Sequence, residues 1–181
     1  MFWKRKKGSK KKKILILLDF ENIQRNIKMT ATPENFSVIT GFDNILKRIS
    51  SEVGGISNVF VFAPPHTASL QGENFYELGF FTIFCPRVKD KKGREIDTTD
   101  DILIKFGRKI IYQFNEYTHL CIGSGDKDFA PLVREAIRQG LKIIIIAGGL
   151  GSISSELIKL ADTNPITKKK MVYIFSPTEN Q

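Results

Sequence analysis

The sequence predicts an α/β fold, with a central, mostly parallel sheet between two layers of helices. Short apolar runs alternate with segments of helical period along the chain. Each run has the length of a strand, and it is continuously apolar, as expected for strands that are buried on both faces. Such alternation is typical of parallel strands joined by right-handed helical crossovers. The prediction is therefore a three-layer α/β/α architecture.

The expected strands are apolar runs bounded by charged residues or glycine. The first has the sequence ILILL at residues 14–18 and ends directly before Asp19. Its length and continuous apolar character suit a central strand of the sheet. The other expected strands cover residues 59–63, 80–85, 120–122, 141–147 and 172–175.

The expected helices lie between these strands and carry an apolar stripe. In residues 43–53 the stripe contains Ile45, Leu46, Ile49 and Val53, which recur at helical spacing. Similar stripes predict helices over residues 101–114, 128–139 and 152–160. The segment 128–139 also begins with an acid and is followed by Gly140, which are helix start and stop signals.

The length and composition are those of one globular domain. The chain has 181 residues, of which 41% are hydrophobic, and this is enough to bury a sizeable core. We expect a basic, disordered arm at residues 1–13, a domain at residues 14–176 and a short tail at residues 177–181. Neither Cys85 nor Cys121 lies in a C-x-x-C or zinc-ligand pattern, which favours a reducing compartment without a disulfide framework.

The apolar runs are too short for a membrane span or a secretory signal. The run at residues 14–18 follows a basic stretch but has only five residues before Asp19, which is shorter than the apolar part of a signal peptide. We therefore expect a cytoplasmic protein. The sequence does not determine whether it is a monomer or a homodimer.

Most of the net charge lies in the arm. The chain has a formal charge of +9, and eight basic residues precede the first strand: Lys4, Arg5, Lys6, Lys7, Lys10, Lys11, Lys12 and Lys13. Such an arm can neutralise phosphates of RNA or DNA without sequence preference, or it can be a solvated tail. A nuclear or membrane-surface address is a weaker alternative.

Acidic residues follow the expected strands at the edge where ligands bind in open α/β sheets. Asp19 ends the first strand, and the stretch GSGDKD places Asp126 and Asp128 after the strand 120–122. A third acidic group stands at the start of a helix and contains Glu95, Asp97, Asp100 and Asp101. Each acid alone can shape a turn or cap a helix. Caps and turns do not explain why three groups point toward one edge.

A cation would explain this gathering of carboxylates. Two carboxylates about 5 Å apart repel each other by roughly 3 kcal/mol at an effective dielectric constant near 20. Oxygen ligands without a partnering His or Cys indicate Mg²⁺ or Mn²⁺. The corresponding chemistry is metal-assisted hydrolysis, in which an ion activates water and stabilises the leaving oxygen.

Other mechanisms have less support. His66 and His119 have no Ser or Cys partner at a spacing that suggests a catalytic triad. The glycine-rich stretch at residues 148–151 does not match either common phosphate-binding motif. We interpret it first as a turn and second as a phosphate contact.

The three acidic groups, in this order, resemble those of the NYN domain, the LabA-like branch of the PIN-like nuclease superfamily. The resemblance rests on LLDFEN at residues 17–22, on Asp101 at a helix start, and on SGDKDF at residues 124–129 followed by PLV. Residues 154–157 and 161–162 also resemble the closing helix of the family. The resemblance covers roughly residues 14–165 and implies a PIN-like, Rossmann-like fold.

The resemblance implies a metal-dependent nuclease that acts most often on RNA. The implied metal-binding and catalytic acids are Asp19, Asp101, Asp126 and Asp128, with Asn22 and Ser124 as supporting polar groups. In the family the middle acid commonly follows Lys-Gly, but here Lys92-Gly93 lies eight residues before Asp101. Asp97 or Asp100 can therefore take that place. We expect Lys127 and the arm residues Lys10, Lys11, Lys12 and Lys13 to hold the nucleic-acid backbone.

Two other functions remain open. A PIN-like domain can serve as a non-catalytic RNA-binding module, and the loss of an acid would favour this role, but none is plainly missing. A Toprim-like enzyme also carries one acid after a strand and Asp-x-Asp after another. The Phe-x-Pro-Leu-Val sequence after Asp128 favours the NYN interpretation. The leading hypothesis is an endoribonuclease, with DNA as a possible second substrate.

Overall fold

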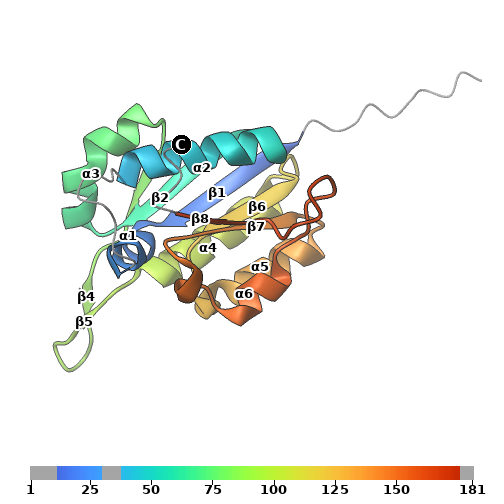
Figure 1. Cartoon of the computed structure of the whole chain (residues 1–181). Helices are drawn as coiled ribbons and strands as arrows, with labels where there is room; N and C mark the ends of the chain where they lie inside the picture. Colours follow the sequence, from blue (N-terminus) through green and yellow to red (C-terminus); the bar gives the residue numbers. More distant parts are fainter. Residues whose placement is uncertain (1–11, 30–37, 176–181) are drawn as a thin grey trace, which may run out of the picture.

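The computed structural model describes residues 12–29 and 38–175 and has a six-stranded sheet at its centre (Figure 1). The strand order is β3-β2-β1-β6-β7-β8, and all neighbouring strands are parallel. The strands are β1 (Lys13–Asp19), β2 (Gly55–Ala63), β3 (Phe81–Phe84), β6 (His119–Gly123), β7 (Lys142–Ala147) and β8 (Val172–Ile174). The predicted fold class is confirmed.

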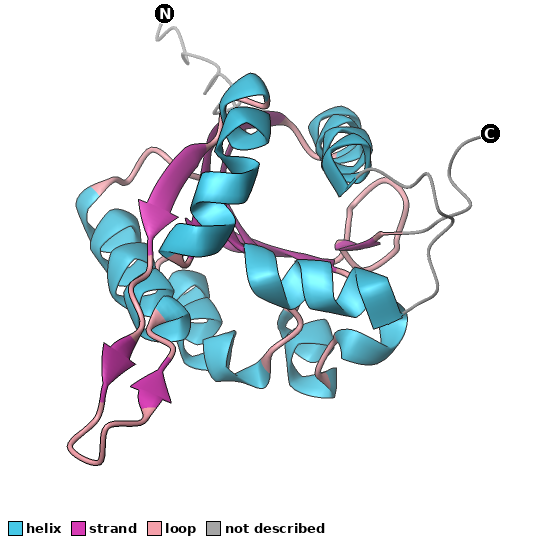
Figure 2. Cartoon of the chain, turned by 90° about the vertical axis from the view of Figure 1, so that its left-hand side faces the viewer, coloured by secondary structure: helices cyan, strands magenta, loops and turns pink. Residues whose placement is uncertain are grey.

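Helices cover both faces of this sheet (Figure 2). One face packs against side chains from α1 (Phe20–Met29), α2 (Val38–Glu52) and α3 (Pro65–Glu77). The other face packs against α4 (Thr99–Gln113), α5 (Ala130–Arg138) and α6 (Ser155–Leu160). None of the described helices combines the length and the apolar character that a membrane span requires.

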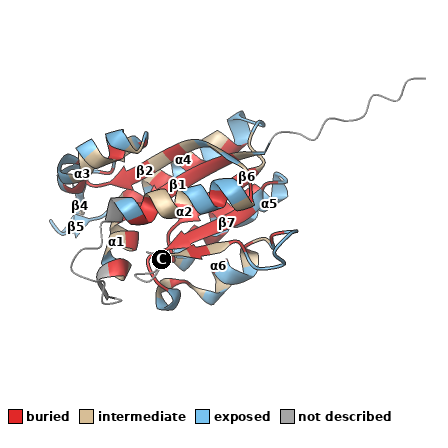
Figure 3. Cartoon of the chain, turned by 45° about the horizontal axis from the view of Figure 1, so that its top comes forward, coloured by how far each residue is buried: buried red, intermediate tan, exposed pale blue. Residues whose placement is uncertain are grey.

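The central strand β1 divides its side chains between the two cores. Ile14, Ile16 and Leu18 belong to the core on one face, whereas Leu15 and Leu17 belong to the core on the other. All five side chains are fully buried, because successive residues of a strand point to opposite faces. Figure 3 shows the same burial along the neighbouring strands. The continuous apolar run is thus a requirement of a strand covered on both sides.

Two helices were absent from the sequence prediction. In α1, Phe20, Ile23 and Ile27 are buried, and their spacing is helical, but the helix follows β1 without a loop. In α3, an extended Pro64 precedes the helix, which begins at Pro65, a favourable first position for proline. The apolar stripe of α3 is weak because its sequence is mostly polar and contains Gly72.

A two-stranded hairpin was also absent from the prediction. Its antiparallel strands are β4 (Val88–Lys89) and β5 (Glu95–Ile96). Their pattern is too short to be recognised as a strand signal. The hairpin projects from the body of the molecule beside α1 and the start of α4 (Figures 1 and 2).

The sheet order brings the ends of β1 and β6 together. β1 pairs with β2 on one side and with β6 on the other, so the chain connections run in opposite directions from β1. In parallel α/β sheets, this reversal opens a crevice at the carboxyl ends of the strands. Asp19 is the last residue of β1, and the loop containing Asp126 follows β6. The predicted acidic groups therefore meet at one place.

Candidate active site

A small pocket lies at the carboxyl ends of β1 and β6 and at the start of α4. Its volume is about 120 Å³. Acidic side chains dominate its lining, which consists of Asp19, Glu21, Asn22, Arg25, Asp97, Thr99, Asp100 and Asp126. The pocket is a concave site rich in carboxylates, at the position where this class of fold binds ligands.

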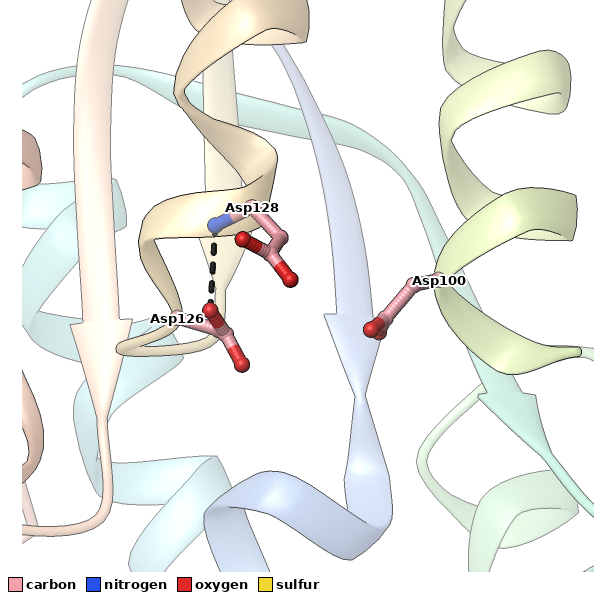
Figure 4. A group of neighbouring side chains, drawn as sticks. All are labelled: Asp100, Asp126 and Asp128. Atoms are coloured by element: carbon pink, nitrogen blue, oxygen red, sulfur yellow. Dashed lines mark hydrogen bonds between the residues drawn. The ribbon is translucent and has the colours of Figure 1, made fainter. Parts of the chain in front are cut away.

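Three carboxylates converge beside this pocket, and two of them, Asp100 and Asp126, line it. Asp100, Asp126 and Asp128 each offer one oxygen, and these oxygens all lie within 4.8 Å of one another. Figure 4 shows Asp100 approaching from the start of α4, while Asp126 and Asp128 come from the loop after β6 and the turn that follows it. Two oxygens bound to one Mg²⁺ lie up to about 4 Å apart, so small side-chain rotations can bring the three onto one ion. The all-oxygen donor set fits Mg²⁺ or Mn²⁺.

The loop that carries Asp126 and Asp128 is held by local hydrogen bonds. The Ser124 hydroxyl accepts a bond from the Asp126 amide at 3.2 Å. Asp126 Oδ1 in turn accepts one from the Asp128 amide at 3.0 Å and so caps the 3-10 helix Lys127–Phe129. Of the two acids, Asp126 is thus the one that caps, although Asp128 is the first residue of the helix expected from the sequence. The Asp128 side chain is exposed.

The first acidic group is connected to this loop through Asn22. The Asn22 amide donates to Asp19 Oδ1 at 3.1 Å, and Asn22 Oδ1 accepts a hydrogen bond from the Gly125 amide at 3.4 Å. Ser124 is fully buried beside it. Asn22 and Ser124, which the sequence suggested as supporting polar groups, thus hydrogen-bond to the backbone of the acidic loop.

Gly125 fits between two loops where a larger residue does not. A Cβ atom at this position would lie 2.0 Å from the Ser152 carbonyl oxygen, and the Gly125 carbonyl accepts a hydrogen bond from the Ser154 amide at 2.9 Å. We expect Gly125→Ala to lower the free energy of unfolding by about 3 kcal/mol, because backbone must move to relieve the overlap. Urea unfolding measures this change.

A matched control for this substitution lies on the opposing loop. A Cβ atom on Gly151 would meet no heavy atom within 4 Å, so Gly151→Ala should change the free energy of unfolding by less than about 0.5 kcal/mol. Equal effects of the two substitutions would contradict the steric explanation.

Asp19 is buried and holds its proton unusually tightly. Only 6% of the residue is exposed. Burial, together with the nearby charges of Asp100 and Asp97, raises the pKa of Asp19 to about 7, while the Asn22 amide and Arg25 partly oppose the change. Burial likewise raises the pKa of Asp100, together with repulsion from Asp126 and Asp97. Burial and neighbouring negative charge thus disfavour the ionised forms of Asp19 and Asp100, whereas hydrogen bonding from Thr99 lowers the pKa of Asp97 despite its partial burial.

The acids at the start of α4 lie in three different environments. Asp100 joins the converging carboxylates. Asp97 also lines the pocket, but its Oδ1 accepts a hydrogen bond from the Thr99 amide at 2.8 Å, which satisfies one of the free amides at the helix start. Asp101, which the sequence favoured, is exposed and lies outside the converging group. The geometry therefore favours Asp100 as the middle acid.

Other predicted residues lie farther away. Lys127 is exposed between Asp126 and Asp128. Lys12 and Lys13 stand at the amino end of β1, about 20 Å from Asp19 at the usual rise per strand residue. Lys10 and Lys11 lie outside the described residues.

The remaining sequence candidates have structural surroundings. His119 lies buried at the start of β6, where burial lowers its pKa to about 4. A Cβ atom on Gly148 would lie 2.5 Å from the Ile23 carbonyl oxygen, so this glycine permits close packing against α1. This role is consistent with the interpretation of residues 148–151 as a turn.

Three residues that line the pocket were not predicted as site residues: Glu21, Arg25 and Thr99. Glu21 and Arg25 lie on α1 and line the pocket, and they are four residues apart, so they share a helix face. Arg87 lies 3.8 Å from Glu21 Oε2, and the Thr67 hydroxyl donates to Glu21 Oε1 at 2.6 Å. The helical spacing of α1 was the available signal for Arg25. Only the fold brings Arg87 close.

A family comparison agrees with this geometry. The model of the NYN domain matches residues 13–167, which is most of the chain. The chain belongs to the NYN domain family. The NYN domain is part of the PIN-like nuclease superfamily, so a nuclease-type fold and an acidic group occur together in this protein.

Structural comparison supports the fold of this NYN domain independently. A crystal structure of a protein of unknown function from Vibrio parahaemolyticus RIMD 2210633 is similar, with a TM-score of 0.71 and 19% sequence identity. The similarity covers 94% of this chain and 97% of the other. At 19% identity, this similarity is evidence for the fold alone. No curated protein matches the chain significantly.

Proposed function

We propose that this NYN domain is a metal-dependent endoribonuclease that hydrolyses phosphodiester bonds of RNA. The observation that carries the proposal is the convergence of Asp100, Asp126 and Asp128, whose oxygens lie within 4.8 Å of one another. The family supplies a nuclease-type fold around this group. A merely structural role would leave the mutual repulsion of these carboxylates without compensation.

The proposed roles follow from the position of each acid. Asp100, Asp126 and Asp128 would hold Mg²⁺ or Mn²⁺, and the buried Asp19 would complete the negative side of the pocket. A divalent cation bound there supplies positive charge that acidifies water and stabilises charge developing on the phosphate. Asn22 and Ser124 fix the loop on which the acids stand.

Positive side chains near the pocket would hold the RNA backbone. Arg25 lines the pocket, and Lys127 is exposed next to the acids. Neither contact reads bases, so we propose binding with little sequence preference. Single-stranded DNA is the nearest competing substrate.

The test is cleavage of labelled single-stranded RNA with Mg²⁺, with Mn²⁺ or with a chelator. We expect the wild type to cleave only with a metal and Asp126→Asn to cleave about 10³-fold more slowly. Asparagine retains an oxygen that can accept the Asp128 amide, so the loop should keep its turn. Binding of RNA by both proteins without cleavage in either metal would sink the enzyme proposal and favour a binding module. Preferential cleavage of DNA would overturn the choice of RNA.

A further inference from the structure

The hairpin formed by residues 88–96 is attached directly to the rim of the acidic pocket. Arg87, at its base, lies 3.8 Å from Glu21 on the pocket wall and 3.8 Å from Glu95 on the opposite strand. The Thr98 hydroxyl donates to the Pro86 carbonyl at 2.5 Å, and α4 begins at the next residue, Thr99. The hairpin therefore has a defined starting point next to Asp100.

The tip of the hairpin is held in one conformation. Asp90 Oδ1 accepts hydrogen bonds from the Lys92 amide at 2.7 Å and the Arg94 amide at 2.9 Å. The Arg94 guanidinium donates to Asp90 Oδ2 at 2.8 Å. Gly93 has a φ of +76°, a left-handed conformation that glycine adopts without strain. The tip is thus organised before any ligand binds.

The lysines of this tip are available to an anion. Lys89, Lys91 and Lys92 are exposed, and no carboxylate of the described residues forms an ion pair with them. Arg94 is neutralised by Asp90 at 2.8 Å. Three lysines without an ion pair to a described carboxylate therefore stand on the hairpin, and Glu95, the cross-strand partner of Lys89, pairs with Arg87 at 3.8 Å instead.

The pocket by itself would repel a polyanion. Its lining contains five carboxylates and one arginine, so the approach of a phosphate requires positive charge nearby as well as a bound cation. The basic arm enters the fold at Lys13, about 20 Å from Asp19 along β1. The hairpin is attached at the pocket itself and points away from the end at which β1 begins (Figure 1). Among the described residues, the attachment point of the hairpin thus lies closer to the pocket than the start of β1 does.

We propose that the hairpin of residues 88–96 is a substrate-binding arm that holds the phosphate backbone of single-stranded RNA beside the acidic pocket. This inference rests on the proposed nuclease function and identifies the element that positions its substrate. Lys89, Lys91 and Lys92 contact phosphates outside the cleaved bond. Arg87 links the arm to the pocket through Glu21.

The second face of the hairpin favours an unpaired strand over a duplex. Val88 and Ile96 are cross-strand partners, and each is 45% exposed. Cross-strand partners point to the same face, so the two form an apolar surface near the hairpin base. Unpaired bases can pack on such a surface, whereas the bases of a duplex are already stacked inside it.

The test replaces Lys89, Lys91 and Lys92 with glutamine in the full chain. Binding of fluorescent single-stranded RNA is followed by anisotropy in a chelator, so that cleavage does not interfere. We expect the affinity at 150 mM salt to fall about tenfold and the slope of log K against log salt to decrease by about 2, since each lost phosphate contact removes roughly 0.7 from a single-strand slope. Thermal unfolding should be unchanged, because these side chains are exposed.

A matched control removes the same charge elsewhere. Lys142, Lys159 and Lys169 are exposed, and they lie near the amino ends of β7 and β8, at the opposite end of the sheet from the pocket. Their replacement by glutamine should change RNA affinity less than threefold. Equal losses in the two variants would show a net-charge effect and overturn the proposal. A loss for duplex RNA alone would overturn the assignment to single strands.

Measuring RNA cleavage as well as RNA binding allows this inference and the proposed function to be tested separately. If the wild type cleaves RNA, the hairpin variant should show a KM about tenfold higher, and an unchanged KM and affinity would overturn the inference alone. If the wild type does not cleave in any metal, the nuclease proposal fails. The anisotropy measurement then still decides whether the hairpin binds RNA.

Discussion

Asp100→Asn is expected to lower the rate of RNA cleavage by about 10³-fold, whereas Asp101→Asn should lower it by less than threefold. The two residues are adjacent and both replacements remove one carboxylate. Asp100 points toward Asp126 and Asp128 (Figure 4), whereas Asp101 is exposed and lies outside this group. Rates with saturating Mn²⁺ and with saturating Mg²⁺ measure the difference.

This pair of variants also controls for charge and folding. Both lie in the first turn of α4, where a carboxylate favours the helix electrostatically. For Asp100 this favourable effect is offset, because burial and neighbouring acids disfavour its ionised form, so neither replacement should unfold the helix start. A larger loss of activity in Asp101→Asn than in Asp100→Asn would restore Asp101 as the middle acid. Equal large losses would indicate that the helix start, rather than one ligand, had been disturbed.

Asp19→Asn is expected to stabilise the metal-free protein by as much as about 4 kcal/mol at pH 8. The pKa of Asp19 rises from 3.8 to about 7 in the folded state, so the folded protein binds this proton more tightly than the unfolded chain does. The favourable contribution is present below pH 3.8 and is lost as the pH rises through about 7. At pH 8 the folded state must bury a charged carboxylate at about 1.4 kcal/mol per pKa unit, which asparagine avoids.

Urea unfolding in a chelator at pH 5 and pH 8 measures this effect. The gain from Asp19→Asn should be much smaller at pH 5, where the folded wild type keeps the proton. Added Mg²⁺ should stabilise the wild type more than the variant, because binding to the native state shifts the unfolding equilibrium. An Asp19→Asn protein that is less stable than the wild type at pH 8 would contradict the assigned cause of the pKa shift.

The strands were predictable because a strand that is buried on both faces has a continuous apolar sequence. The runs at residues 14–18 and 120–122 become β1 and β6, and each strand is longer in the structure by one residue at each end. The acids at Asp19, Asp126 and Asp128 were found from their places after strands. The order of the strands in the sheet then brings these acids together. No local sequence pattern predicts that order.

The middle acid could not be chosen from the sequence because several acids stand in a row. An α-helix turns by about 100° per residue, so moving the helix start by one position changes which side chain faces the pocket. We expected the helix to begin at Asp101, but α4 begins at Thr99, and Asp100 is turned inward. The hairpin was missed for a different reason, since its strands are only two residues long.

The hydrogen bond from the Asp128 amide to Asp126 has a further consequence for the Asp-x-Asp sequence. The first carboxylate shapes the segment of backbone on which the second one stands. The two acids therefore arise as a unit from three consecutive residues, and one residue inserted between them would change both the turn and the direction of the second side chain. The relative positions of Asp126 and Asp128 therefore depend on local sequence. The positions of Asp19 and Asp100 beside them depend on the folding of the whole sheet.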